Sequence, residues 1–258
     1  MIGVVLSGGG TKGAFQAGVI AQLGLKPDLV VGTSIGAINA MVWNFKGQDE
    51  MSKTWHNVDS RSDWLGLNWS RGFMDGIYQS KPLRKWLDDV WISGTPRFKS
   101  YACRVDMTTG ALEYVPHDSI RYTDAVIDSA TVPVAMKPEA EYVDGGVREK
   151  VPLRFAVGAG CDEIHVIMCN PIARDPEHAK MPKNPLSMIM RTVDILTHEG
   201  QNDDIKRASR GKNVRFYAPE KPLYDTFCFD GKLLKDAFRQ GLEAKSVSPE
   251  ELSDRLCR

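Results

Sequence analysis

Two strand-to-helix turns within the first 45 residues constrain the fold of this 258-residue chain most strongly. An apolar run from Ile2 to Ser7 ends in glycines and precedes alanine and aliphatic residues at helical spacing from Thr11 to Leu23. A second apolar, β-branched run from Leu29 to Thr33 precedes a helix-like segment from Ile35 to Trp43. Strands that alternate with helices form parallel sheets with helices on their faces, because a parallel pair needs a crossover connection. The sequence therefore predicts an α/β fold.

The rest of the chain extends this pattern. We expect a hairpin from Tyr101–Met107 and Ala111–Val115, strands at Glu163–Cys169 and Asn213–Tyr217, and helices at Lys81–Trp91, Tyr122–Ala130 and from Leu186 to about Ser209. Ser248, Pro249 and Glu251 form a capping box, which predicts a terminal helix.

The stretch from about 45 to 95 differs from its surroundings and is predicted as a helical and loop insertion after the helix-like segment Ile35 to Trp43, within a single domain of residues 1–258. All six tryptophans lie between residues 43 and 91. Indole rings favour the boundary between water and acyl chains, but they also pack in cores, so both interpretations stay open. Phe73 and Met74, between two glycines, are the candidate tip of a lid at residues 60–78.

Composition excludes several classes of function. Lys plus Arg and Asp plus Glu each number 33, so the overall charge favours neither nucleic acid nor an anionic membrane. No apolar stretch approaches the ~20 residues of a membrane span, and no leader pattern precedes the first strand. The five cysteines follow no metal-binding or CxxC spacing, so we expect reduced thiols and no metal site. A cytoplasmic protein is expected, with membrane contact at most transient, local and peripheral.

Gly32, Ser34 and Gly36 stand in the pattern Gly-x-Ser-x-Gly between a predicted strand and a predicted helix. This is the context of a nucleophile elbow, in which a sharp turn strains the serine backbone and larger flanking side chains would collide with it. An ordinary glycine-rich turn has the same pattern. The surrounding strand and helix favour Ser34 as a nucleophile.

The run Gly8–Gly13 follows the first strand and opens a helix, so its backbone N–H groups are suited to bind an anion. It matches G-x-G-x-x-G, but Asp28 precedes the second strand instead of ending it, and Ala14 stands where a P-loop needs lysine. Because Ser34 follows the next strand, we interpret the run as an oxyanion hole. A nucleotide- or phosphate-binding module, with Ser34 as a structural turn residue, is the alternative.

A serine nucleophile needs a base. The candidate histidines are His56, His117, His165, His178 and His198. His165 lies inside an apolar strand and His178 in a polar loop, whereas His198 on the long helix is retained as the base of an alternative Ser-His-Asp esterase. Asp144 instead lies at a strand end before two glycines, where another backbone can approach closely.

Taken together, four ordered blocks resemble the patatin-like phospholipase family. They are Gly8–Gly13, Gly32–Gly36, Ser129-Ala130-Thr131-Val132-Pro133, and Tyr142-Val143-Asp144-Gly145-Gly146-Val147. The resemblance covers about residues 1–45 and 125–170. It implies a three-layer α/β/α domain with a mostly parallel central sheet, and a Ser34–Asp144 dyad that uses no histidine, metal or cofactor.

The resemblance also implies a reaction. Ser34 would attack a lipid or other carboxylic ester, as in phospholipase A or lysophospholipase chemistry, with Asp144 as base. Gly9 and Gly10, helped by Gly8 or Ile35, would hold the oxyanion. Supporting motif residues are Lys12, Gly13, Gly32, Gly36, Gly145 and Gly146. Lys12 either faces a lipid phosphate or is solvated.

Two positions depart from the family pattern. Family members often carry asparagine where this chain has Glu149-Lys150, and an aromatic residue commonly stands near Met136. These positions bear on substrate choice and not on the dyad. Head group, acyl length, the ester position cut and oligomeric state are left undetermined.

Overall fold

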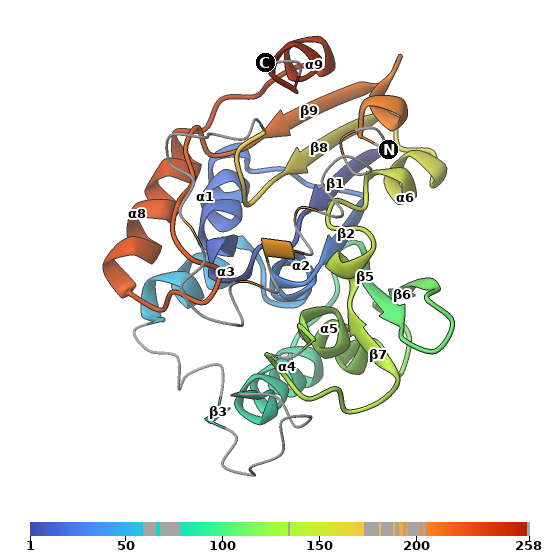
Figure 1. Cartoon of the computed structure of the whole chain (residues 1–258), viewed down its shortest axis with the longest axis vertical. Coiled ribbons are helices and arrows are strands. Elements are labelled where there is room, and N and C mark those ends of the chain that lie inside the picture. Colours follow the sequence, from blue (N-terminus) through green and yellow to red (C-terminus); the bar gives the residue numbers. More distant parts are fainter. Residues whose placement is uncertain are drawn as a thin grey trace.

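The central feature of the structure, a computed structural model, is one mixed β-sheet (Figure 1). The structure describes residues 1–58, 66–67, 78–133, 135–172, 181, 188, 191–192, 195, 202 and 205–256. The sheet contains β1 (Ile2–Leu6), β2 (Leu29–Thr33), β5 (Lys99–Asp106), β6 (Leu112–Pro116), β7 (Tyr142–Asp144), β8 (Glu163–Ile167) and β9 (Asn213–Tyr217). Its order is β6-β5-β2-β1-β8-β9, and β7 pairs with β5. The two-residue strands β3 (Gly66–Leu67) and β4 (Tyr78–Gln79) pair separately.

Helices cover both faces of the sheet. They are α1 (Gly13–Leu23), α2 (Ile35–Lys46), α3 (Gln48–Asn57), α4 (Lys81–Ser93), α5 (Tyr122–Ala130), α6 (Leu153–Gly158), α8 (Gly231–Leu242), α9 (Pro249–Leu256) and the 3₁₀ turns η1 (Gly10–Lys12) and η4 (Gly145–Val147). Val4 and Leu6 pack into a core with α1, α2, α5 and α8, whereas Val5 packs into a second core with α6 and α9. Successive strand residues point to opposite faces, so this alternation makes three layers.

The predicted fold class is confirmed. β1 pairs in parallel with β2 and β8, β2 with β5, and β8 with β9, while only β6 and β7 run antiparallel within the described sheet. The strand Leu29–Thr33 and the helix Tyr122–Ala130 have the predicted bounds. The predicted helix from Leu186 to about Ser209 falls largely outside the described residues, although residues 205–209 are helical.

α2 continues to Lys46, beyond its expected end at Trp43. The buried Asn44 side chain explains this extension, because its amide oxygen accepts the N–H groups of Arg97 at 2.7 Å and Phe98 at 3.0 Å. Its amide nitrogen donates to Ser100 Oγ at 2.9 Å. Asn44 therefore anchors the end of α2 to the start of β5.

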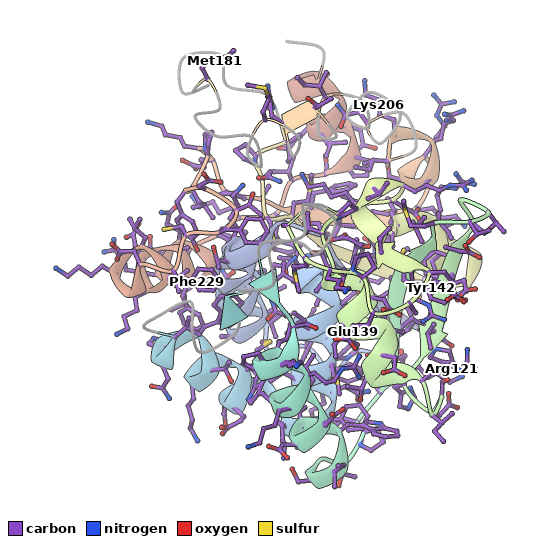
Figure 2. The ribbon with its side chains drawn as sticks, turned by 60° about the horizontal axis from the view of Figure 1, so that its bottom comes forward. Arg121, Glu139, Tyr142, Met181, Lys206 and Phe229 are labelled. Atoms are coloured by element: carbon purple, nitrogen blue, oxygen red, sulfur yellow. The ribbon has the colours of Figure 1, made fainter. Side chains whose placement is uncertain are left out.

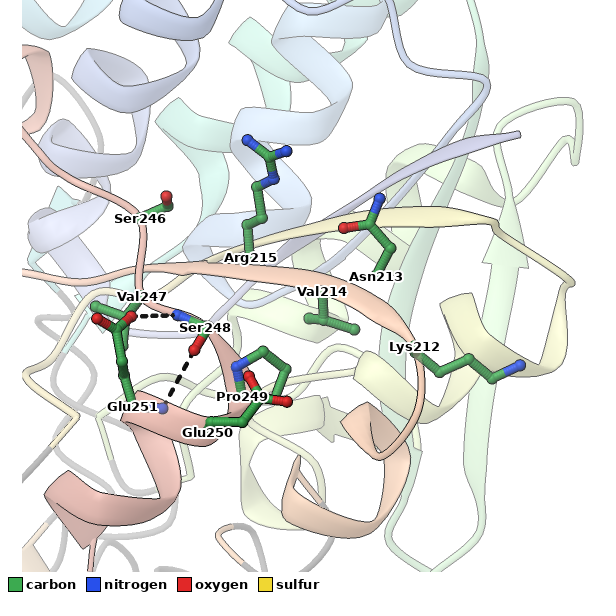
Figure 3. A pocket seen from close by; sticks show the side chains of 10 residues that line it. All are labelled: Lys212, Asn213, Val214, Arg215, Ser246, Val247, Ser248, Pro249, Glu250 and Glu251. Atoms are coloured by element: carbon green, nitrogen blue, oxygen red, sulfur yellow. Dashed lines mark hydrogen bonds between the residues drawn. The ribbon is translucent and has the colours of Figure 1, made fainter.

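The capping box of the terminal helix is confirmed (Figure 3). The N–H of Ser248 donates to Glu251 Oε2 at 2.9 Å, and the N–H of Glu251 donates back to Ser248 Oγ at 3.2 Å. These bonds satisfy two donors at the start of α9.

Part of the stretch expected to form a cover packs into the main core. Met51 and Trp55 of α3 and Leu83 and Leu87 of α4 are buried there. Arg84 of α4 also binds the carboxylates of Asp124 on α5 and Glu139, both at 2.7 Å; Glu139 lies at the centre of Figure 2, between α4 and α5. These contacts hold α4 against α5.

Candidate active site

Ser34 stands at the turn between β2 and α2 with φ 58° and ψ −125°. Among the described residues, no other non-glycine has a positive φ. A Cβ on Gly32 would lie 2.3 Å from the backbone of Gly36, and a Cβ on Gly36 would lie 2.3 Å from the carbonyl oxygen of Leu6. Both glycines are therefore required by close backbone approach, and the turn has the strained geometry of a nucleophile elbow.

Asp144 approaches Ser34 because two strands share one edge of β5. β6 occupies one edge of β5 along Tyr101–Val105. On the other edge, Thr33 of β2 lies opposite Cys103 and Asp144 of β7 lies opposite Arg104. Since β2 is parallel to β5 and β7 antiparallel, the carboxyl ends of β2 and β7 converge at this point. The Ser34 hydroxyl approaches the Asp144 carboxyl there closely enough to lower its pKa.

The Asp144 carboxyl is held in a defined orientation. Its Oδ1 accepts the N–H of Gly146 at 2.7 Å, which caps η4. Burial raises the pKa of Asp144 to about 6, and the hydrogen bonds from Ser34 and Gly146 and the charge of Lys150 limit this rise. With this pKa, the carboxyl is mostly ionised at neutral pH and able to accept a proton.

The glycine loop lies beside Ser34. A Cβ on Gly8 would lie 3.3 Å from Ser34 Cβ. Within the described part of the chain, the N–H groups of Gly9 and Gly10 bond to no acceptor. Ile35, the first residue of α2, has its N–H at a helix N-terminus, where such groups lack an intrahelical partner. Gly9, Gly10 and Ile35 can therefore donate to an oxygen held against Ser34.

The structure corrects the prediction that the N–H of Gly8 helps to hold the oxyanion. Its N–H donates to the carbonyl oxygen of Lys150 at 2.9 Å, so the fold already uses this donor. The N–H of Thr11 likewise donates to the carbonyl oxygen of Thr226 at 3.0 Å. With these two donors used, the loop offers fewer N–H groups to a phosphate than a phosphate-binding loop does.

The supporting residues lock the loop in place. A Cβ on Gly13 would lie 2.4 Å from Ile35 Cγ1, and one on Gly145 would lie 2.4 Å from the carbonyl oxygen of Cys103. Lys12 Nζ donates to Asn170 Oδ1 at 2.8 Å, so this ammonium is tied to the segment after β8. Both predicted roles of Lys12 are compatible with this contact, because its side chain is only half-buried.

The described histidines have other partners. His165 is buried, stacks on Tyr217 and contacts Glu163 Oε1 at 3.1 Å, and burial lowers its pKa. His56 Nδ1 lies 2.8 Å from its own helix's carbonyl at Ser52, and His117 Nδ1 accepts the N–H of Ser100 at 3.3 Å. His178 and the alternative base, His198, lie outside the described residues.

The tryptophans divide into two groups. Trp43 and Trp55 are buried, and Trp86 and Trp91 pack half-buried against the same core, as the core-packing interpretation predicts. Trp64, Trp69, Phe73 and Met74 lie outside the described residues, as does almost all of the candidate lid at residues 60–78.

The described residues carry few other functional features. Across the described ranges, no group of three or more His, Cys, Asp and Glu side chains is arranged to hold a metal ion. In the same ranges, no helix has both the length and the apolarity to cross a bilayer. A hollow of about 350 Å³ between β9 and α9 is lined by residues 212–215 and 246–251 (Figure 3).

The contacts that support Ser34 and its surroundings could not be predicted from the sequence. Ser129 Oγ accepts the backbone N–H of Ser34 at 2.8 Å. Thr33 Oγ1 donates to the carbonyl of Glu149 at 3.0 Å, and the Tyr114 hydroxyl bonds to the carboxylate of Glu149. Ser129 belongs to one of the four blocks that resemble the family, but no sequence pattern indicates that it bonds to Ser34.

Comparisons with known proteins identify the family of the chain. The family model described as "Patatin-like phospholipase" matches residues 4–157, which include β1, the glycine loop, the Ser34 elbow and Asp144. No curated protein sequence matches the chain. Among solved structures, the crystal structure of VipD from Legionella pneumophila aligns with a TM-score of 0.41 and 14% identity, over 95% of this chain and 68% of that one. Because the family model matches more than half of its length, the chain belongs to the patatin-like phospholipase family.

Proposed function

We propose that the chain is a serine carboxylic-ester hydrolase that acts on lipid acyl esters, with Ser34 as nucleophile and Asp144 as its base. Family membership supports lipid acyl hydrolase activity in general. The observation that carries the finer assignment is that the strained Ser34 and the buried Asp144 meet where β2 and β7 end on one edge of β5.

The reaction follows from this pair. As Ser34 Oγ bonds to the ester carbonyl carbon, its proton passes to the Asp144 carboxylate and the carbonyl electrons form an oxyanion. Collapse of this intermediate breaks the bond to the alcohol oxygen, which takes the proton from Asp144. Asp144 then deprotonates a water that attacks the acyl-enzyme, and the fatty acid leaves as Ser34 regains its proton.

The oxyanion is assigned to the N–H groups of Gly9 and Gly10, with Ile35 as a third donor. These groups come from the glycine loop and the start of α2, both fixed by close backbone contacts before substrate binds. Preorganised donors of this kind contribute about 3 kcal/mol each to lowering the barrier.

A long acyl chain in a bilayer or micelle is the substrate class that we favour. A transient peripheral contact with the lipid surface, as for a cytoplasmic lipid hydrolase, belongs to the proposal. The departure from the family pattern at Glu149-Lys150 bears on Asp144 as well, contrary to the expectation from the sequence, because the charge of Lys150 lowers the pKa of Asp144.

The test compares three variants on a soluble p-nitrophenyl ester and on mixed phospholipid micelles. Ser34→Ala and Asp144→Asn should abolish hydrolysis of both while the circular dichroism spectrum is retained, whereas His198→Ala should keep most of the activity. Loss of activity in His198→Ala with activity kept in Asp144→Asn would replace the dyad by the Ser-His-Asp alternative. Activity in Ser34→Ala would exclude both.

A further inference from the structure

The backbone N–H of Ser34 has a specific acceptor. Ser129 Oγ, fully buried at the end of α5, receives it at 2.8 Å. In the strained conformation of Ser34, this N–H precedes the first turn of α2 and turns away from the helix ladder. A buried N–H without an acceptor is costly, so the Ser129 hydroxyl stabilises the strained turn specifically.

The segment Ser129–Thr131 also binds Asp144, the other member of the proposed dyad. The carbonyl oxygen of Thr131 accepts the backbone N–H of Asp144 at 3.0 Å. Thr131 is itself fixed, since its N–H donates to the carbonyl of Asp128 at 3.0 Å and its Oγ1 donates to the carbonyl of Ile127 at 2.8 Å. The end of α5 therefore holds the backbones of both Ser34 and Asp144.

A buried ion pair anchors this helix end to β5. Arg104 donates to Asp128 Oδ2 and to Glu113 Oε2, both at 2.8 Å, and its guanidinium lies 3.5 Å from the ring centroid of Tyr142. Arg104 also pairs through its backbone with Asp144. The segment Ser129–Thr131 is thus fixed relative to the strand along which the two dyad members meet.

We propose that Ser129 is a positioning residue, which holds the Ser34 elbow through its backbone N–H and so sets the approach of Ser34 Oγ to Asp144. This inference rests on the proposed function. Ser129 touches no reacting atom; it acts through the backbone of Ser34.

Loss of the Ser129 hydroxyl should affect turnover and not substrate affinity. Without the acceptor, Ser34 spends less time in the conformation that faces Asp144, and small displacements of a nucleophile cost much of the rate. We expect Ser129→Ala to lower kcat by roughly 10- to 100-fold with KM nearly unchanged. Ser129→Cys keeps the side chain's shape but offers only a weak sulfur acceptor, so kcat should fall there also.

The experiment uses a matched control on the same helix. Thr123→Val removes a buried hydroxyl that has no hydrogen-bond partner among the described residues. Steady-state kinetics on a soluble ester, thermal unfolding, and amide hydrogen exchange of the Ser34 peptide are measured for all three variants. The control should keep kcat near wild type.

The outcomes separate this inference from the proposed function. A selective fall in kcat for the two Ser129 variants, with faster exchange at the Ser34 peptide, supports the positioning role. Wild-type kcat in Ser129→Ala, or an equal fall in Thr123→Val at equal stability, overturns it while leaving the hydrolase proposal intact. A wild-type chain that neither hydrolyses esters nor reacts with a fluorophosphonate overturns the proposed function itself, and the positioning role with it.

Discussion

Asp144 meets Ser34 because β2 and β7 run in opposite directions along the same edge of β5, so that their carboxyl ends converge. Their last residues, Asp144 and Thr33, lie opposite consecutive residues of that strand, Arg104 and Cys103. The pair is thus positioned by sheet register, which is rigid, and the carboxyl is buried by the same arrangement. Burial of the Asp144 carboxyl affects both the pH dependence of hydrolysis and the stability of the fold.

Hydrolysis should depend on the ionisation of Asp144. Because its pKa is raised to about 6, the carboxyl is protonated below that pH and cannot accept the Ser34 proton. We expect kcat/KM on a soluble ester to fall to about a tenth between pH 7 and pH 5, following a single group. A rate that stays flat down to pH 5 would contradict Asp144 as the base.

Asp144→Asn should stabilise the fold that it inactivates. An acid whose pKa is raised on folding loses stability as the pH rises through the unfolded value near 4 toward about 6, so at pH 7 the ionised carboxyl is destabilising. We expect a gain on the order of 1 to 3 kcal/mol, seen as an increase of several degrees in Tm at pH 7 and little change at pH 4.

Asp106→Asn is the matched control for this effect. The N–H groups of Thr108 and Thr109 lower the pKa of the exposed Asp106, which is the opposite sign. Its replacement should give no gain at pH 7. A Tm of Asp144→Asn at or below wild type at neutral pH would show that burial does not oppose ionisation of Asp144.

Gly9→Ala should impair turnover through the oxyanion hole. A Cβ at this position would lie 2.3 Å from Cys169 Cβ, so the loop and its free N–H groups must move. We expect a fall of about 100-fold in kcat. Gly158→Ala, on α6 with no atom within 4 Å of the new methyl, should keep wild-type turnover. Equal rates in the two variants would make the glycine loop structural only.

Arg104→Ala should destabilise the protein strongly. The side chains of Arg104 and Asp128 are each 6% exposed, so the substitution leaves a buried carboxyl without its cation. We expect a loss of about 3 to 5 kcal/mol in urea unfolding, because removing one partner of a buried pair is costly. Lys53→Ala, which removes an exposed pair with Glu50, should change stability by less than about 0.5 kcal/mol. Similar losses would contradict the anchoring role of Arg104.

Local chemistry made the strands and turns near Ser34 predictable. Gly32 and Gly36 are needed by the turn itself, so the elbow could be predicted from neighbouring residues, as could the capping box at Ser248 and Glu251. The three-residue strand β7 is too short for any periodicity, and its antiparallel register on β5 could not be predicted.

Contacts between distant segments account for the rest of what the sequence missed. Gly8 has the same local signature as Gly9, and only the carbonyl of Lys150 removes its N–H from the oxyanion hole. The hydrogen bonds from Lys12 to Asn170 and from Ser34 to Ser129 could not be predicted either. Each of these pairs joins residues far apart in the chain, where no spacing rule applies.

The rate of fluorophosphonate labelling, followed by intact mass and peptide mapping, tests the central claim most directly. The wild-type protein and His198→Ala should each gain one adduct, on Ser34, at similar rates. Asp144→Asn should react roughly 100-fold more slowly, because the hydroxyl has lost its base. Labelling at another serine, unchanged labelling of Asp144→Asn, or loss of labelling in His198→Ala would contradict a Ser34–Asp144 dyad.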